Sequence, residues 1–84
     1  MELIVISAVW CPSCLVMKKV IKDIESNFNE LKITKYDYDL NEDDIKDYNV
    51  GNNLPLFILI KDGVEISRMS GEHSYEEMVN FINC

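Results

Sequence analysis

The chain has 84 residues, of which 48% are hydrophobic and 27% charged, and its net charge is −7. This length predicts one domain, residues 1–84, that buries only about 60% of the surface of the unfolded chain. The acidic balance, with no cluster of Lys and Arg, disfavours nucleic acid and an anionic membrane surface as direct partners. No stretch approaches the roughly 20 apolar residues that cross a bilayer.

The first residues and the cysteine count indicate the cellular setting. MELIVISAVW is largely apolar, but it has neither the basic start nor the small-residue cleavage site of a signal peptide. Three cysteines do not form the even-numbered disulfide framework of a small secreted protein. We expect a cytoplasmic protein and take it to be a monomer.

The first half of the chain predicts a strand, a helix and a second strand. Residues 2–7 (ELIVIS) are an apolar, β-branched run, which is typical of a strand buried on both faces of an α/β sheet. A helix is predicted over 12–27, because proline suits the first helical position and apolar side chains then recur at helical spacing. Residues 31–38 alternate and are rich in strand formers.

The next segment predicts a short helix and a hairpin. Asn41 is the expected cap of a helix over 42–48, whose acidic first turn suits the positive end of a helix dipole. The run LFILIK, residues 56–61, is a second buried strand. Asp-Gly at 62–63 favours a two-residue hairpin turn, after which residues 64–70 return antiparallel.

The last element completes the predicted fold. Ser74 and Glu77 form a capping box, and the apolar spacing that follows predicts a closing amphipathic helix. The order is then β-α-β-α-β-β-α. A right-handed crossover makes the first two strands parallel, and the hairpin adds two more. We expect an α/β fold, a four-stranded mixed sheet flanked by helices.

The stretch VWCPSC holds two cysteines three positions apart, Cys11 and Cys14, where the first strand gives way to the first helix. At a helix N-terminus, free backbone N–H groups and the helix dipole stabilise a thiolate and make the sulfur a nucleophile. In such a turn we expect the first cysteine to face outward. The second is expected one turn inward, near enough to close a disulfide, so the pair suits two-electron thiol–disulfide exchange.

The motif, placed at this junction, resembles the active site of the thioredoxin superfamily, and the resemblance extends along nearly the whole chain. Trp10 matches the family tryptophan, and Leu54-Pro55 resembles the segment with the family's cis-proline. Gly71 resembles the glycine that leaves room for a substrate backbone. The resemblance implies a minimal thioredoxin fold and a protein-disulfide oxidoreductase that needs no cofactor.

The resemblance also implies a mechanism and partners. Cys11, the nucleophile, attacks a disulfide of a protein substrate, and Cys14, the resolving cysteine, then attacks Cys11 and releases the reduced substrate. A reductase of the thioredoxin-reductase type recharges the pair. The backbone flanking the proline pairs with an extended substrate segment. The implied docking surface, mostly apolar, comprises Trp10, Pro12, Ser13, Leu54, Pro55 and Gly71.

Three departures from the thioredoxin pattern and one match concern the thiols. Pro12 removes an N–H donor beside the first cysteine, and Leu15 stands where many thioredoxins have lysine, so we expect a less stabilised thiolate. Val5 occupies the place of the buried aspartate that many thioredoxins use to take the proton from the second cysteine. Lys35 matches that aspartate's lysine partner, and we expect an unpaired Lys35 to assist the ionisation of Cys14.

Three other interpretations stay open. Proline directly after the first cysteine is a glutaredoxin feature and suggests recharging by glutathione, although residues 70–73 differ from the glutathione-binding segment and basic neighbours are few. A thioredoxin-fold module that only binds proteins is another alternative. Half of a zinc site is the third, but His73 and Cys84 are the only other soft ligands in the sequence, so we expect no metal.

Five side chains receive structural interpretations. His73 is expected to be a solvated loop residue, and Cys84 an incidental terminal thiol. Tyr36, Tyr38 and Tyr48 are expected to pack around the second strand and the short helix, with Tyr38 bordering the docking surface.

Overall fold

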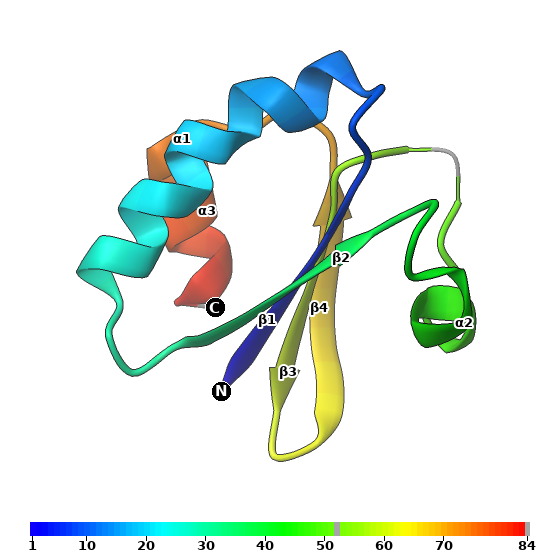
Figure 1. The fold of residues 1–84 in the computed structure, drawn as a ribbon. Helices are drawn as coiled ribbons and strands as arrows, with labels where there is room; N and C mark the ends of the chain where they lie inside the picture. The colour runs from blue at the N-terminus through cyan, green and yellow to red at the C-terminus, as the bar shows by residue number, and fades with distance from the viewer. Residues whose placement is uncertain (52, 84) are drawn as a thin grey trace.

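The computed structural model describes residues 1–51 and 53–83, so the expectation for Cys84 lies outside the described residues. Within these ranges the strands and helices follow in the predicted order (Figure 1). Their bounds are β1 Glu2–Ser7, α1 Pro12–Asn27, β2 Lys32–Asp37, α2 Glu42–Ile45, the 3₁₀ turn η1 Lys46–Tyr48, β3 Leu56–Lys61, β4 Val64–Ser70 and α3 Tyr75–Ile82.

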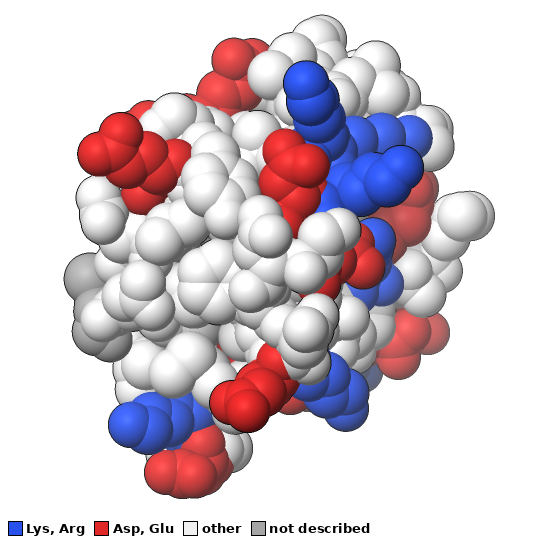
Figure 2. All heavy atoms as spheres, turned by 90° about the vertical axis from the view of Figure 1, so that its left-hand side faces the viewer, with Lys and Arg blue, Asp and Glu red and all other residues white. Residues whose placement is uncertain are grey.

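The strands form one mixed sheet with β1 and β3 at its centre. The spatial order is β2-β1-β3-β4, in which β1 and β2 are parallel and the other neighbours antiparallel. Figure 1 shows α1 and α3 together on one side of the sheet and α2 on the other. Figure 2 views the side that carries α1 and α3, where the centre is uncharged and Lys and Arg side chains gather towards the upper right.

The apolar run of β1 is buried because both faces of the sheet are covered. Leu3 and Val5 belong to the core cluster under α1 and α3, whereas Ile4 and Ile6 belong to the cluster under α2. Side chains of a strand alternate between the two faces, so an uninterrupted apolar run fits a central strand with helices on both sides. Ile45 is the buried contribution of α2 to the second cluster.

The short helix differs from its prediction. The expected helix over 42–48 is divided into α2 and η1, and Asn41 makes no side-chain cap for α2. Its Oδ1 instead accepts a hydrogen bond from the backbone N–H of Asp37 at 2.9 Å. The capping role of Asn41 was therefore wrong, because its side chain turns back to the end of β2.

The predicted turn and capping box are confirmed. Asp62 and Gly63 have φ values of 54° and 79°, the left-handed conformations that a two-residue hairpin turn requires. In α3, Ser74 Oγ accepts the N–H of Glu77 at 3.1 Å, and Glu77 Oε1 accepts the N–H of Ser74 at 2.9 Å. Both local signals act within a few residues, which is why the sequence alone was sufficient to predict them.

Replacing Ser74 tests the contribution of this cap. Ser74→Ala removes the acceptor for the Glu77 N–H, so we expect the free energy of unfolding, measured by urea denaturation, to fall by about 1 kcal/mol. Ser26→Ala is the matched control, since Ser26 Oγ bonds only the Lys22 carbonyl inside α1. Its expected change is within about 0.5 kcal/mol. Equal losses in the two variants would contradict this account of the cap.

Candidate active site

The cysteine pair occupies the junction between β1 and α1. Cys11 is the N-cap residue of α1 with extended φ and ψ, and Pro12 follows at the first helical position. The backbone N–H of Cys11 donates to the Ala8 carbonyl at 3.2 Å, which closes the turn after β1. The Cys11 sulfur accepts the backbone N–H of Cys14 at 3.4 Å. A sulfur in this position caps the helix in the way an oxygen acceptor usually does.

Both thiols are free and buried. Cys11 is 7% exposed and Cys14 is 6% exposed. The expectation that Cys11 faces outward was therefore wrong. Its Sγ lies 3.6 Å from the carbonyl oxygen of Leu54, to which the thiol donates, and both cysteines pack in the cluster that contains Ile45. The segment before β3 thus covers the sulfur from a part of the chain 43 residues away.

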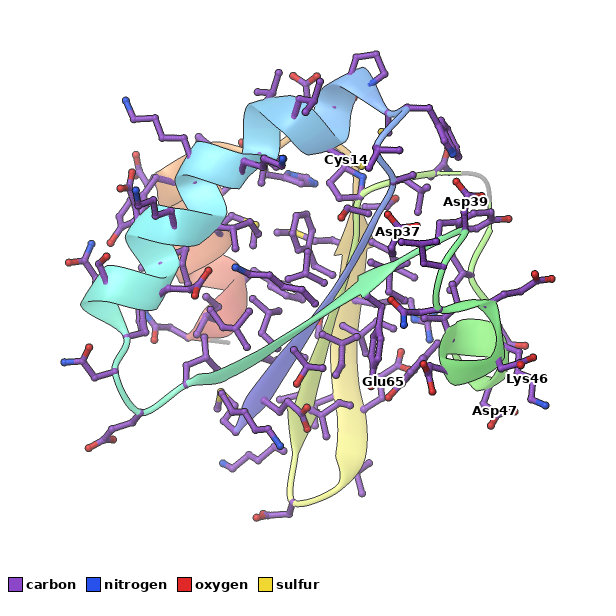
Figure 3. The ribbon with its side chains drawn as sticks, viewed as in Figure 1. Cys14, Asp37, Asp39, Lys46, Asp47 and Glu65 are labelled. Atoms are coloured by element: carbon purple, nitrogen blue, oxygen red, sulfur yellow. The ribbon has the colours of Figure 1, made fainter. Side chains whose placement is uncertain are left out.

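Burial keeps Cys14 protonated. It is the main cause that raises the pKa of the Cys14 thiol to about 11, and the hydrogen bond to Cys11 raises it further. The negative charge of Asp37 acts in the same direction. Figure 3 shows Cys14 at the start of α1, and Asp37 and Asp39 where β2 ends, at the same end of the sheet. The neutral thiol is therefore the form of Cys14 at physiological pH.

This raised pKa makes folding stability depend on pH. Below pH 9.0, the ordinary pKa of a cysteine, Cys14 is neutral in the folded and unfolded chain. Between pH 9 and 11 the unfolded chain ionises first, so the free energy of unfolding should fall by up to about 1.4 kcal/mol per pH unit. Cys14→Ala, in reduced protein carrying Cys84→Ser, should abolish this part of the slope in urea denaturation from pH 8 to 11.

Tyr48 provides the internal reference for that experiment. Burial also raises the pKa of Tyr48, so its contribution to the slope begins only above pH 10 and is common to both proteins. It therefore cancels in the difference between the parent and Cys14→Ala. Parallel pH profiles for the two proteins would show that Cys14 is not held neutral by the fold.

The residues expected to form the docking surface divide into two groups. Trp10, 59% exposed, and Pro12 lie on the surface, and Ser13 is half-buried. Leu54 and Pro55 are buried, so their side chains do not offer the expected apolar contact.

Backbone contacts join these residues to the cysteine pair. The Leu54–Pro55 peptide bond is cis, as the resemblance implied. The Pro55 carbonyl accepts the N–H of Gly71 at 2.9 Å, and Gly71 has a φ of 87°, a conformation that favours glycine. Since the Leu54 carbonyl meets Cys11, three segments distant in the sequence converge at the start of α1.

Several exposed apolar side chains that flank the pair were not predicted from the sequence. Val9, Leu15 and Val16 are each more than half exposed and flank the cysteines in sequence. Large apolar side chains that are exposed together indicate a contact surface. The signal was present in the sequence: Leu15 and Val16 lie on the helix face opposite to Met17 and Ile21, which point into the core.

Trp10 is held by two contacts that bridge distant parts of the chain. Its indole Nε1–H donates to Asp39 Oδ2 at 2.7 Å. Its ring meets the ring of Tyr38 edge to face, with centroids 6.2 Å apart. Tyr38 therefore borders the exposed tryptophan, as expected, whereas Asp39 gave no signal in the sequence beyond its place in an acidic run. Tyr36 and Tyr48 pack together as predicted.

The expectation of an unpaired Lys35 was wrong. Lys35 Nζ forms an ion pair with Glu25 of α1, and both side chains are largely exposed. The last turns of α1 pass beside β2, which brings the carboxylate to the lysine. Lys35 still lines the same cavity as Cys14 and Val5. Val5 is buried, so it does occupy a buried position, as expected for the place of the family aspartate.

His73 lies in a loop, as expected, but it is half-buried and hydrogen-bonded instead of fully solvated. Its Nε2 lies 2.8 Å from the Ser70 carbonyl, its Nδ1 lies 3.5 Å from Glu77 Oε2, and its side chain is 23% exposed. The ring thus connects the end of β4 to α3. Among residues 1–51 and 53–83, no group of three or more His, Cys, Asp or Glu side chains is placed to hold a metal ion. In the same residues no helix is long and apolar enough to span a membrane.

The sheet order, the dithiol at the start of α1 and the cis-proline segment beside it define a dithiol protein of thioredoxin fold. The thioredoxin family model matches residues 1–84, and the chain belongs to this family. The fold class and the family resemblance that the sequence predicted are both confirmed.

Named relatives are plant and bacterial thioredoxins. The chain is 37% identical over 65 residues to "Thioredoxin H2" of Arabidopsis thaliana, covering 77% of this chain and 48% of that protein. It is 30% identical over 76 residues to "Thioredoxin" of Chlamydia pneumoniae, covering 90% and 74%. The X-ray structure of Fasciola hepatica thioredoxin matches with a TM-score of 0.89 and 28% identity, over 98% and 77%. The chain thus spans about half the length of the plant relative and about three quarters of the chlamydial one.

Proposed function

We propose that this chain is a thiol–disulfide oxidoreductase that reduces disulfides of protein substrates through Cys11 and Cys14. The observation that carries this proposal is the pair of free thiols at the N-terminus of α1, with the Cys11 sulfur in contact with the N–H of Cys14. Membership of the thioredoxin family supports it. Residues 1–84 act as one thioredoxin-like domain in this proposal.

In the first step, Cys11 acts as the nucleophile. Its thiolate attacks one sulfur of the substrate disulfide, a mixed disulfide forms, and the other substrate sulfur leaves as a thiolate that takes a proton. The N–H of Cys14 lies 3.4 Å from the Cys11 sulfur and favours its negative charge. Loss of the thiol proton also frees the Leu54 carbonyl, which becomes available to the backbone of an extended substrate.

In the second step, Cys14 resolves the mixed disulfide. Cys14 loses its proton and attacks the Cys11 sulfur, which releases the second substrate thiolate and leaves an intramolecular disulfide. The raised pKa of Cys14 keeps this thiol neutral until the substrate is attached. The reduced substrate leaves with two electrons, and the chain is left oxidised.

Substrates and an electron donor complete the cycle. The exposed apolar side chains Val9, Trp10, Leu15 and Val16 offer a docking surface, together with Pro12. Ser13, Gly71 and the backbone of Leu54 and Pro55 lie next to it. A reductase of the thioredoxin-reductase type returns two electrons to the pair, and no cofactor is needed on this chain. The dithiol state is maintained in a reducing compartment, which we take to be the cytoplasm.

Two cysteine variants test the proposal. In the Cys84→Ser background, Cys11→Ser should reduce the turnover of a disulfide substrate such as insulin to the uncatalysed rate, since the attacking sulfur is lost. Cys14→Ser should perform only the first step and accumulate a mixed disulfide with the substrate, detectable by mass spectrometry. Cys84→Ser alone is the control and should keep full turnover. A Cys11→Ser variant that still turned over would refute the assignment of the nucleophile.

The same assay separates the alternatives that the sequence left open. Turnover with glutathione and glutathione reductase, but not with a thioredoxin reductase, would replace the proposed electron donor with glutathione. A chain that binds a protein partner equally well with Cys11→Ser, and that has no turnover in any form, would be a binding module.

A further inference from the structure

A cavity of about 500 Å³ lies between α1 and the edge of the sheet, beside the buried cysteine Cys14. Its apolar lining includes Val5 from β1, Met17 and Ile21 from α1, and Pro55. A volume of this size is typical of sites that bind small organic molecules. The exposed side chains proposed to dock a substrate lie around Cys11 and do not line this space, which shares only Cys14 and Pro55 with the proposed machinery.

The charged residues that line the cavity are mostly cationic. They are Lys18, Lys22 and Lys35, with Glu25 as the only acid. Glu25 and Lys35 form an ion pair with each other. Lys18 and Lys22 have no counter-ion among the residues that the structure describes, so the cavity carries two uncompensated positive charges in a chain of net charge −7.

The spacing along α1 explains why the charges gather there. Lys18 and Lys22 follow Cys14 at steps of four residues, so the three side chains share one face of the helix. The buried Met17 and Ile21 lie next to this face. Figure 2 shows that basic side chains gather on the side of the molecule that carries α1. Cationic groups beside an apolar lining are complementary to a molecule that has a negative charge at one end and an apolar body.

We propose that this cavity binds a small organic anion with an apolar body, such as a medium-chain carboxylate. The carboxylate meets the ammonium groups of Lys18 and Lys22, and the apolar body lies against Val5, Ile21 and Pro55. The binding is non-covalent and needs neither the oxidised nor the reduced form of the pair. It is thus a second site, separate from the surface that is proposed to dock the disulfide substrate.

The bound anion acts on the neighbouring thiol. Cys14 lines the same cavity, so a carboxylate held there opposes the formation of a second negative charge on the Cys14 sulfur. By linkage, the ligand binds more weakly to the chain when Cys14 is ionised. Occupancy of the cavity therefore slows every reaction that requires the Cys14 thiolate.

The test is a titration of the reduced protein with octanoate, followed by amide ¹H–¹⁵N NMR. We expect saturable shifts at Val5, Ile21 and Lys35. Lys18→Met/Lys22→Met should weaken binding about tenfold, because two ion pairs with the ligand are lost. The matched control, Lys19→Met/Lys32→Met, has the same net charge and replaces exposed lysines that do not line the cavity, so its affinity should stay within about twofold.

A neutral ligand and a thiol-alkylating reagent provide two further tests of the proposal. The alcohol 1-octanol has the same chain length without the charge and should bind about tenfold more weakly than octanoate. In Cys11→Ser/Cys84→Ser, octanoate should slow the alkylation of Cys14 by iodoacetamide, and the Lys18/Lys22 variant should lose this effect. Circular dichroism verifies that both double variants are folded.

Three results would overturn the proposal. The first is the absence of saturable shifts in the parent protein, and the second is shifts confined to the surface around Trp10. The third is an equal loss of affinity in the two double variants, which would mean a response to net charge alone. None of these results bears on the turnover of disulfides, which is measured separately.

Discussion

The contact of the Cys11 sulfur with the N-terminus of α1 is the constraint on which the rest of the site depends. This sulfur accepts the N–H of Cys14 and donates its own proton to the Leu54 carbonyl. A helix start needs acceptors for its free N–H groups, and here a reactive group takes that place. The same contact fastens the segment before β3 over the pair, and the Gly71–Pro55 hydrogen bond adds the end of β4. The Cys11 sulfur therefore both caps the helix and holds the segments of the site together.

Burial of both thiols determines how the pair works. The fold holds Cys14 neutral, and Val5 provides no carboxylate to remove its proton. Lys35 does not directly take the place of the missing carboxylate, because its positive charge is paired with Glu25. The N-terminal half of α1 presents two different surfaces: the exposed apolar side chains of Leu15 and Val16, and the lysines Lys18 and Lys22, which line the cavity beside Cys14.

The sequence was sufficient where the deciding interactions are local. The apolar run of β1, Pro12 at the start of α1, the Asp62-Gly63 turn and the Ser74 cap all depend on close neighbours in the chain, and each was predicted correctly. The wrong cap at Asn41 is a local error, since its side chain accepts the N–H of Asp37 four residues earlier. The errors at the cysteine pair concern contacts between distant segments. The burial of Cys11 is set by a segment 43 residues away, and the pairing of Lys35 by a different element. Such contacts follow from packing of the whole fold, which periodicity and spacing do not specify.

The equilibrium potential of the Cys11–Cys14 couple, measured with Cys84 replaced by serine, tests the central claim most directly. A strongly stabilised thiolate would favour the reduced form and make the pair an oxidant. Here Pro12 removes an N–H donor beside Cys11 and Leu15 carries no positive charge, so the account predicts a reversible two-electron couple at or below about −250 mV, the range of a thioredoxin-like reductant. A potential of about −200 mV or higher, or no reversible couple, would contradict it.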